Sequence, residues 1–553
     1  MNKRIYLLLI TIISCSWFQN VFAQNASKPN ILVILIDDGR YDNYTFTNGP
    51  SWFQTPNIKR IADEGINYKY CFPASSLCSP SRASIMTGDY PHHTGIVRNG
   101  VSDSLTIPTI ATILQSNGYY TGFVGKYGFN KWPIPGYDYF LDSSNDDYWN
   151  TYYFYYKTGW QLISGHKTTV LTDSAKRFIE TAPSDKPWCL FLFHKAPHSP
   201  LQPRAEDSTL YENEIMPFPA NFYKYTIDYP NYMYFCHSYS GDSSQLKNEY
   251  LKYYQLLAGV EWSTGVMLNT LDSLGILDST MVIFTSDNGL LKGEHLASGK
   301  QLALEESLRL PLLIRYPKWF TPGTVVKDQL VSLIDLAPTI IDAAGITNPV
   351  NMDGWSLHDA TKQRKEFYYE YFNKNYECTP TMHAVRSFEY ELIHNSCTFT
   401  TNEFYDLTND SLMNTNQINN PAYADLIDLY FQKLDSLEKF YGDTLWVDTI
   451  VTCKLTSNFP TFDEDADVIG TEIIIAPNPG NGTGNIFYKA LVAALLNVQV
   501  YDLMGRKIEE LNPVVKSNKI SVSFDFASLA KGIYLIKIQT TDEVYSFRYL
   551  KTE

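Results

Sequence analysis

Short apolar runs and longer segments of helical spacing follow one another along the first half of the chain. The apolar runs are continuous and rich in β-branched residues, which is typical of strands buried on both faces of a sheet. They span residues 30–36, 119–124, 188–193 and 281–285. Apolar residues recur at helical spacing in 55–65, 108–116, 172–181 and 248–274. Strands that alternate with helices predict an α/β fold whose central sheet is flanked by helices.

The pattern changes near the C-terminus. Residues 451–470 contain an acidic run and have the character of a linker, and residues 471–553 alternate short strands with glycine turns. That alternation predicts a small β-sandwich. A chain of 553 residues is also too long for one ordinary domain. We therefore expect a large α/β part followed by a separate all-β unit.

The N-terminus has the pattern of a secretory signal peptide. Residues 1–4 are basic, 6–13 are apolar, and Val21-Phe22-Ala23 offers small residues for cleavage. The apolar run is too short to span a bilayer. We predict a signal peptide over 1–23, and an alternative is lipidation of Cys15.

Composition narrows the function classes. The hydrophobic fraction of 44% and the charged fraction of 19% are those of a globular protein. A net charge of −15 argues against nucleic-acid binding, so any anion site must be a local cationic pocket.

The cysteines are spaced far apart. No cysteine pair has C-x-x-C spacing, which makes a zinc site unlikely, and an exported chain can form disulfides. Cys378 with Cys397 is the best candidate pair, and buried free thiols are the alternative.

Two carboxylates follow the first apolar run. Asp37 and Asp38 lie at its C-terminal end, where open α/β sheets bind ligands. Adjacent carboxylates repel each other unless a cation joins them, so this pair indicates a metal, although two solvated turn residues would look the same. The sequence alone leaves both interpretations open.

Residues 78–88, C-S-P-S-R-A-S-I-M-T-G, carry the densest pattern of the chain. They resemble the sulfatase signature C-x-P-S-R-x-x-x-x-T-G without a mismatch. The resemblance implies that a maturation enzyme oxidises Cys78 to formylglycine (3-oxoalanine), which serves as the nucleophile through its hydrated form. Arg82 is about one helical turn further on, so it can face the same side and hold that group.

Further motifs of the sulfatase family lie along the chain. Lys126, His198 in A-P-H-S-P, and Lys300 match family residues that bind the sulfate group, and His295 is an accessory acid or base unless it is structural. Gly128 departs from the family pattern G-K-W-H, in which a histidine helps sulfate release. Sulfatases similar to N-acetylglucosamine-6-sulfatases also lack this histidine.

The resemblance also implies a metal site. Residues 285–289, T-S-D-N-G, match a family element that follows a strand. The implied ligands are Asp37, Asp38, Asp287, Asn288 and the modified Cys78. Hard oxygen ligands of this kind suit Ca²⁺, and Mg²⁺ less well.

Two other stretches resemble known segments. Residues 146–160 are strongly aromatic and resemble a segment of the glucosamine-6-sulfatase group. They are either a sugar-binding wall or a strand packed on the core. The tail resembles the C-terminal sorting domain of the type IX secretion system, with a carbohydrate-binding module as the alternative. A sorting domain works with an ordinary signal peptide, which favours cleavage after Ala23 over lipidation.

The resemblance covers Pro29 to Gly442 and implies an alkaline-phosphatase-like mixed sheet in a catalytic domain over 24–365, with a smaller antiparallel sheet over 366–450. We thus expect a secreted or surface-located, calcium-dependent sulfatase of glycosaminoglycans or algal polysaccharides such as ulvan. Its expected partners are a sulfated glycan, a formylglycine-generating maturase and the type IX secretion machinery, and not nucleic acid. The alternatives are a phosphoester or phosphonate hydrolase of the same superfamily, and a non-catalytic protein that binds sulfated glycans.

Overall fold

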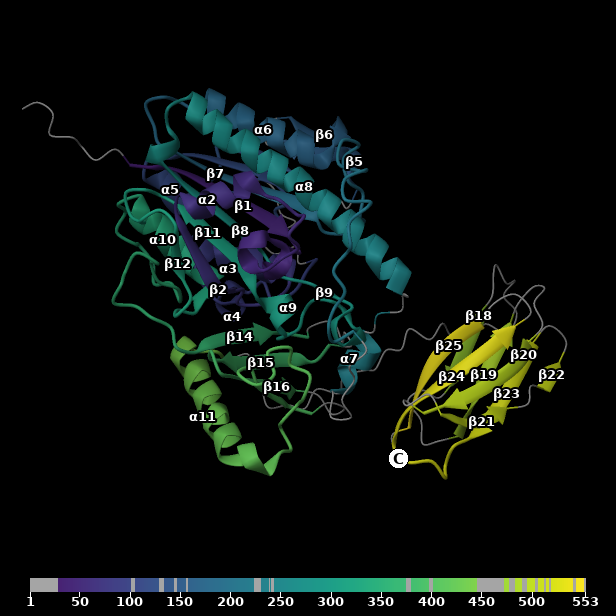
Figure 1. The fold of residues 1–553 in the computed structure, drawn as a ribbon. Coiled ribbons are helices and arrows are strands. Elements are labelled where there is room, and N and C mark those ends of the chain that lie inside the picture. The colour runs from purple at the N-terminus through teal and green to yellow at the C-terminus, as the bar shows by residue number, and fades with distance from the viewer. Residues whose placement is uncertain are drawn as a thin grey trace, which may run out of the picture. The chain divides into compact units, whose positions relative to one another are not determined.

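The computed structural model describes residues 28–444 and most of 472–551. Within the first range, 101–104, 129–133, 144–146, 156–157, 223–229, 238, 240–242, 374–378 and 397–400 are not described, and short gaps also separate strands of the second range. The chain divides into two compact units, Met1–Leu455 and Thr456–Glu553 (Figure 1). The predicted signal peptide, the linker and Cys15 lie outside the described residues.

An eleven-stranded mixed sheet forms the centre of the first unit. Along the sheet the strands are β12 (Thr324–Val326), β2 (Ile66–Phe72), β11 (Leu310–Arg315), β8 (Thr280–Ser286), β1 (Asn30–Asp37), β7 (Trp188–Pro197), β3 (Tyr120–Gly125), β4 (Tyr139–Asp142), β5 (Trp149–Tyr155) and β6 (Gly159–His166), and β13 (Val331–Ser332) pairs with β2. The strands β8, β1, β7, β3 and β4 run parallel to one another. They include the four apolar runs predicted as buried strands.

Helices cover both faces of this sheet (Figure 1). They are α3 (Cys78–Thr87), α5 (Ile110–Ser116) and α10 (Leu336–Ala343) on one face, and α2 (Pro56–Asp63), α6 (Lys167–Thr181) and α8 (Ser243–Ser273) on the other. The shorter helices α4 (Pro91–Thr94), α7 (Asn231–Cys236) and α9 (Glu305–Leu308) lie outside these two layers. The side chains of β1 alternate between two cores. One core contains Ile31 and Val33 with residues of α5 and α10, and the other contains Leu32 and Ile34 with residues of α2, α6 and α8.

The predicted helices end close to their expected bounds, but two of them begin five residues early. α8 begins at Ser243 and not at 248. α6 begins at Lys167 and not at 172, because the ring of His166 accepts a hydrogen bond from the backbone N–H of Thr168 and caps the helix. The predicted helix over 108–116 is α5, which begins after a Thr109 cap that bonds Thr112. No helix among the described residues is long and apolar enough to cross a membrane.

A smaller antiparallel sheet completes the first unit, as predicted. Its strands are β14 (Phe367–Tyr371), β15 (Thr381–Arg386), β16 (Tyr390–Ser396) and β17 (Glu403–Asp406), and α11 (Ala424–Tyr441) packs on it. A two-stranded sheet of β9 (Leu291–Lys292) and β10 (Ser298–Gly299) lies in sequence between β8 and β11 of the central sheet. Cys236 is disulfide-bonded, whereas Cys71, Cys78 and Cys189 are free thiols. The predicted pair Cys378–Cys397 lies outside the described residues.

The second unit consists of two four-stranded antiparallel sheets. One contains β18 (Glu472–Ala476), β19 (Thr483–Lys489), β23 (Lys519–Asp525) and β22 (Val514–Lys516). The other contains β21 (Lys507–Leu511), β20 (Leu495–Tyr501), β24 (Gly532–Thr540) and β25 (Val544–Lys551). The described residues of this unit form strands and turns, as the strand-and-glycine pattern predicted.

Candidate active site

The carboxyl ends of two adjacent parallel strands bring the predicted metal ligands together. β1 and β8 are in register, with Ile36 opposite Ser286, so the residues after them meet at one edge of the sheet. The Ser286 hydroxyl donates to the Ile36 carbonyl (3.0 Å) and accepts from the Gly39 N–H (2.8 Å), which fixes both turns. Asp38 adopts a positive φ of 65° at this point. The turns therefore hold their carboxylates in a defined arrangement.

Four oxygen-bearing side chains occupy this edge and are almost fully buried: Asp37, Asp38, Asp287 and Asn288. The Asn288 amide donates to Asp38 Oδ1 (2.6 Å), and the backbone N–H groups of Asp38 and Asn288 donate to Asp287 Oδ1 (3.2 and 2.8 Å). These hydrogen bonds hold the turn after β1 against the turn after β8.

Helix α3 places Cys78 against this cluster. Cys78 is the first residue of the helix and is 3% exposed. Its Sγ is 3.3 Å from Asp37 Oδ1. One turn later, the completely buried Arg82 contacts Asp287 Oδ2 with NH2 (2.7 Å) and Nε (2.8 Å), and Asp37 Oδ2 with NH2 (3.2 Å). Cys78 and Arg82 therefore lie on the same side of α3, where both contact Asp37, as expected from their spacing.

Three further predicted residues come from distant parts of the chain. Lys300 Nζ is 2.6 Å from Asp38 Oδ1 and 2.8 Å from Cys78 Sγ. Lys126 Nζ is 2.5 Å from Asp37 Oδ2 and 3.8 Å from Cys78 Sγ. His198 Nε2 is 3.8 Å from Asp38 Oδ2. The structure therefore brings all of the main predicted site residues around the Cys78 side chain.

Burial and neighbouring charges shift the pKa values of the ionisable side chains in the site. Burial by itself raises the pKa of Asp37, but the cationic groups around it, Lys126 foremost, lower that pKa well below its usual range. Burial lowers the pKa of Lys300, yet Asp38 raises it well above the usual value. The pKa of the Cys78 thiol is raised to about 12 by burial and by Asp37. At neutral pH the lysines are charged, Asp37 is ionised and the unmodified thiol keeps its proton.

The donor set fits a hard divalent cation. Asn288 Oδ1 is buried and has no hydrogen-bond donor in the part of the chain that the structure describes. Single ligand atoms of Asp37, Asp38, Cys78 and His198 lie within 4.8 Å of one another. Burial and the charge of Asp37 raise the pKa of Asp287, which a nearby cation would oppose. Carboxylate and amide oxygens are the ligands that Ca²⁺ and Mg²⁺ prefer.

The structure also shows the surroundings of His295 and of Gly128, the two positions whose roles the sequence left open. His295 is buried, accepts a hydrogen bond from the Asn221 amide (3.1 Å) and has a pKa lowered to about 3 by burial, which favours a structural role. Gly128 adopts a φ of 92°, and its carbonyl accepts from the Ser79 hydroxyl (2.8 Å). The backbone at the position of the family histidine thus contacts the residue after Cys78.

Three residues around the site were not found by the sequence analysis. Tyr148 OH donates to the His198 carbonyl (2.8 Å), Lys195 Nζ is 3.2 Å from His198 Nδ1, and Tyr253 OH donates to the Asp38 carbonyl (2.8 Å). Tyr148 lies in the aromatic stretch and Lys195 three residues before His198, so both were close to a motif. Tyr253 lies within α8, where no local signal marks it.

The aromatic stretch combines both interpretations that were left open. Tyr153 on β5 is buried in the core, whereas Tyr152 and Trp160 are 57% and 49% exposed. Tyr152 pairs with Leu162, which is 55% exposed, across the β5–β6 hairpin. One face of the hairpin therefore packs on the core and the other presents rings to solvent.

Comparison with known proteins extends the sequence resemblance. Residues 29–346 match the Sulfatase family, 293–439 match the family "N-sulphoglucosamine sulphohydrolase, C-terminal", and 474–551 match "Secretion system C-terminal sorting domain". The N-acetylglucosamine-6-O-sulfatase of Bacteroides thetaiotaomicron is 27% identical over 522 residues, covering 80% of this chain and 92% of the relative. The ulvan-active sulfatase of Formosa agariphila is 25% identical, covering 64% of this chain and 69% of the relative.

Solved structures share the fold. A structure in complex with its substrate D-glucosamine-2-N,6-O-disulfate has a TM-score of 0.72 and 26% identity, covering 76% of this chain and 99% of that one. The phosphonate monoester hydrolase of Agrobacterium radiobacter has a TM-score of 0.64 and 20% identity, covering 75% of this chain and 96% of that one, a likeness of fold alone. The family match covers more than half of the chain and includes Cys78 and every main residue around it. The chain belongs to the sulfatase family and is a sulfuric ester hydrolase that carries a C-terminal secretion-sorting domain.

Proposed function

We propose that the protein removes sulfate from sulfated glycans through a formylglycine derived from Cys78. The observation that carries this proposal is the position of Cys78, which begins a buried helix and touches Asp37, Lys126 and Lys300. A thiol whose pKa is raised to about 12 is a poor nucleophile at neutral pH. This environment suits a side chain that reacts in another chemical form, and the oxidised residue supplies a hydroxyl nucleophile whose aldehyde can re-form.

The charge of the site favours a sulfate group once a cation is bound. Three buried carboxylates, Asp37, Asp38 and Asp287, face three cationic side chains, which are Arg82, Lys126 and Lys300. These charges balance, so a divalent cation gives the site a net positive charge. That charge would attract an anionic ester. We propose Ca²⁺ in preference to Mg²⁺ as the cation, and its chemistry at this site would be that of a Lewis acid. Asp37, Asp38, Asp287 and Asn288 would hold it with the modified Cys78.

The residues of this chain then have separable roles. Lys126 and Lys300 approach the reacting side chain from two directions and would neutralise charge on the sulfate oxygens in the transition state. Arg82 contacts both Asp37 and Asp287, and it would also hold the group at position 78. Asp287 would take the proton of the attacking hydroxyl, and His198 or Lys300 would protonate the leaving sugar oxygen.

The substrate class follows from the relatives and from the exposed rings. The named relatives act on N-acetylglucosamine 6-sulfate groups and on ulvan, so we propose a sulfated polysaccharide or its oligosaccharides as substrate. Exposed rings on the β5–β6 hairpin begin directly after Tyr148, whose hydroxyl contacts His198. A sugar bound at the sulfate site would thus lie beside an aromatic surface.

We further propose the export route and the domain division. A signal peptide over 1–23 would bring the chain to the periplasm, and the unit over 471–553 would direct it through the type IX secretion machinery to the surface or the medium. The catalytic domain would span 24–365, its subdomain 366–450 and the linker 451–470. A formylglycine-generating maturase would act on Cys78 before folding buries it.

The experiment is an assay of sulfate release from the full chain, produced together with such a maturase. The substrates are N-acetylglucosamine 6-sulfate, defined glycosaminoglycan and ulvan oligosaccharides, and a matched pair of aryl sulfate and aryl phosphate. We expect sulfate release from at least one glycan and none from Cys78→Ala. Faster cleavage of the phosphate ester would favour the phosphonate-hydrolase alternative, which the shared fold motivates. Tight glycan binding without any release would favour a binding protein.

A further inference from the structure

A second cavity lies at the far end of α3 from Cys78. Its volume is about 650 Å³, which is within the range of pockets that bind small molecules. Asp89 lines it and follows the C-terminal end of α3, so roughly 15 Å of helix separates it from Cys78. The cavity is therefore distinct from the site of sulfate hydrolysis.

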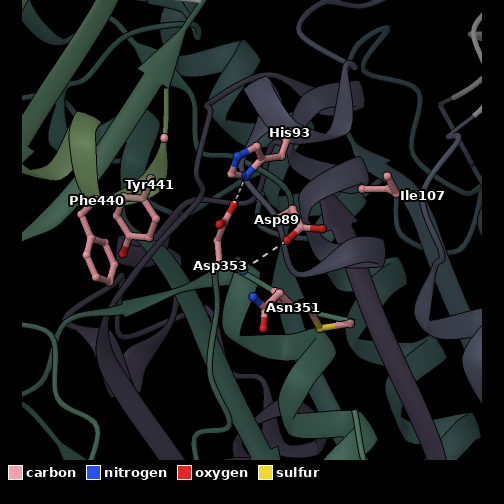
Figure 2. A pocket seen from close by; sticks show the side chains of 9 residues that line it. Asp89, His93, Ile107, Asn351, Asp353, Phe440 and Tyr441 are labelled. Carbon is pink, nitrogen blue, oxygen red and sulfur yellow. Dashed lines mark hydrogen bonds and ion pairs between the residues drawn. The ribbon is translucent and has the colours of Figure 1, made fainter. Parts of the chain in front are cut away.

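Figure 2 shows how separate segments of the first unit enclose this cavity. Asp89 and His93 come from the region around α4, and Asn351 and Asp353 from the connection between α10 and β14. Phe440 and Tyr441 end helix α11. The cavity thus lies where the smaller C-terminal part meets the end of the catalytic helix.

Two carboxylates, Asp89 and Asp353, stand among the polar groups of the cavity. Asp353 Oδ2 accepts from the backbone N–H of Tyr90 (2.9 Å) and from His93 Nδ1 (2.8 Å), so its position is fixed. Asp89 is nine-tenths buried, and its Oδ1 accepts from the Asp353 N–H (3.1 Å). Among the described residues, no side chain or backbone group donates to Asp89 Oδ2. This oxygen is not fully buried and lines the cavity, so it is free to accept a hydrogen bond from a ligand that brings donors.

Apolar side chains also line the cavity. Phe440 is 74% exposed, and its ring lies 5.0 Å from that of Tyr441. Ile107 and Met352 also line the space. An exposed ring beside buried acceptors suits a ligand with one apolar face and several hydroxyl donors at its edge. A pyranose has this combination, because its axial C–H groups pack on rings while its hydroxyls donate.

We propose that this cavity binds an unsulfated pyranose unit of a glycan, apart from the site of hydrolysis. The two carboxylates of the lining outnumber its one imidazole, His93, and no lysine or arginine lines the cavity. The lining therefore repels an anion, so a sulfate on the bound sugar weakens binding. The cavity and the catalytic site therefore prefer opposite states of the same polymer. Binding of this kind would hold the enzyme on stretches from which sulfate is absent or has been removed. The inference does not depend on the identity of the sulfated substrate.

The test measures binding of neutral trisaccharides of glucose, galactose and N-acetylglucosamine to the full chain by calorimetry and saturation-transfer NMR. The same trisaccharides with a 6-sulfate are the matched anionic probes. We expect at least one neutral trisaccharide to bind, and Phe440→Ala and Asp89→Ala each to weaken it about tenfold. Leu429→Ala, an exposed position on the same helix outside the cavity, is the control and should change nothing.

Phe440 is a surface residue, so Phe440→Ala should fold normally and keep its rate of aryl sulfate hydrolysis. This separates the cavity from the catalytic site, and failure of the proposed sulfatase reaction would leave the binding result intact. The proposal is overturned if no neutral trisaccharide binds at millimolar concentration. It is equally overturned if binding is unchanged in both cavity variants, or if the sulfated probes bind there more tightly than the neutral ones.

Discussion

Replacement of Asn288 by alanine should change stability differently with and without calcium. Asn288 Nδ2 donates to Asp38 Oδ1 (2.6 Å) and to the Gly289 carbonyl (2.8 Å), while its Oδ1 is buried without a donor. A hydrogen bond to a charged group contributes about 1.5–3 kcal/mol and a neutral one about 0.5–1.5 kcal/mol, whereas an unsatisfied buried oxygen costs about 1–3 kcal/mol. When a chelator keeps the site free of metal, the cost of the unsatisfied Oδ1 offsets much of the stability that the two hydrogen bonds contribute. We therefore expect Asn288→Ala to lose only about 1 kcal/mol in the free energy of unfolding.

With calcium bound the balance changes, because Asn288 Oδ1 then has a partner. A ligand that binds only the folded state stabilises it by about 2.7 kcal/mol at one hundred times its Kd. Loss of one oxygen ligand raises that Kd, so the calcium-dependent part of the stability falls in Asn288→Ala. The measurement is thermal unfolding of the full chain by circular dichroism, in chelator and across a calcium titration. We expect a calcium-induced rise in Tm that is clearly smaller in the variant than in the wild type.

Asn416→Ala is the matched control. Asn416 is also buried, and its side chain accepts from the Phe404 N–H (3.0 Å) in the smaller sheet, away from the carboxylates. It should lower Tm equally in both conditions. The reasoning fails if calcium leaves the wild-type Tm unchanged, or if Asn288→Ala loses the same Tm with chelator as with saturating calcium.

The remaining predictions concern modification, pH and the tail. Protein made with a maturase should contain the aldehyde at Cys78 by peptide mass spectrometry, and an active enzyme with only the thiol would refute that mechanism. Burial lowers the pKa of His92, but its contact with Glu370 Oε2 (2.7 Å) raises it to about 9. Burial raises the pKa of Glu370 as well, which opposes part of the gain. Stability should therefore be fully present below about pH 6.5 and fall by at most roughly 3 kcal/mol as the pH rises through 9, and His92→Gln should flatten this profile in urea unfolding curves. A chain ending near Asp448 should retain sulfatase activity but remain in the periplasm of its host, and normal export with lost affinity for polymer would instead identify the tail as a carbohydrate-binding module.

The fold was predictable where one local pattern determined each element. The runs over 30–36 and 281–285 are continuous and apolar because β1 and β8 are covered by helices on both faces. The edge strands of the same sheet gave no such signal. β5 and β6 pack only one face, so their rings alternate between core and solvent, and an aromatic run fits either environment. The direction of β11, antiparallel to β8, also depends on neighbours that no local pattern encodes.

The site was predictable where a motif accompanied the chemistry. Asp37, Cys78 and His198 follow strands or begin a helix within short patterns, and the structure places them together. Tyr253 was not predictable, because its hydroxyl reaches the Asp38 carbonyl from the middle of a helix whose other tyrosines are also buried. Burial of a helix face and contact with a site produce the same sequence pattern. The position of α8 next to the end of β1 is what brings Tyr253 to the site, and this position cannot be predicted from the sequence of α8.

At Gly128 the sequence shows which residue is present but not the conformation of its backbone. The sequence shows that the family histidine is absent, but not that the backbone there has a φ of 92°, which L-residues rarely adopt. A side chain at this position would begin 3.4 Å from Arg82 Cδ and 3.5 Å from Ser79 Oγ, and so would start against the helix of Cys78. Strain at such a φ costs about 1–3 kcal/mol for a residue with a Cβ. Gly128→His would therefore introduce this backbone strain directly beside the helix of Cys78, at a residue whose carbonyl accepts the hydrogen bond of the Ser79 hydroxyl.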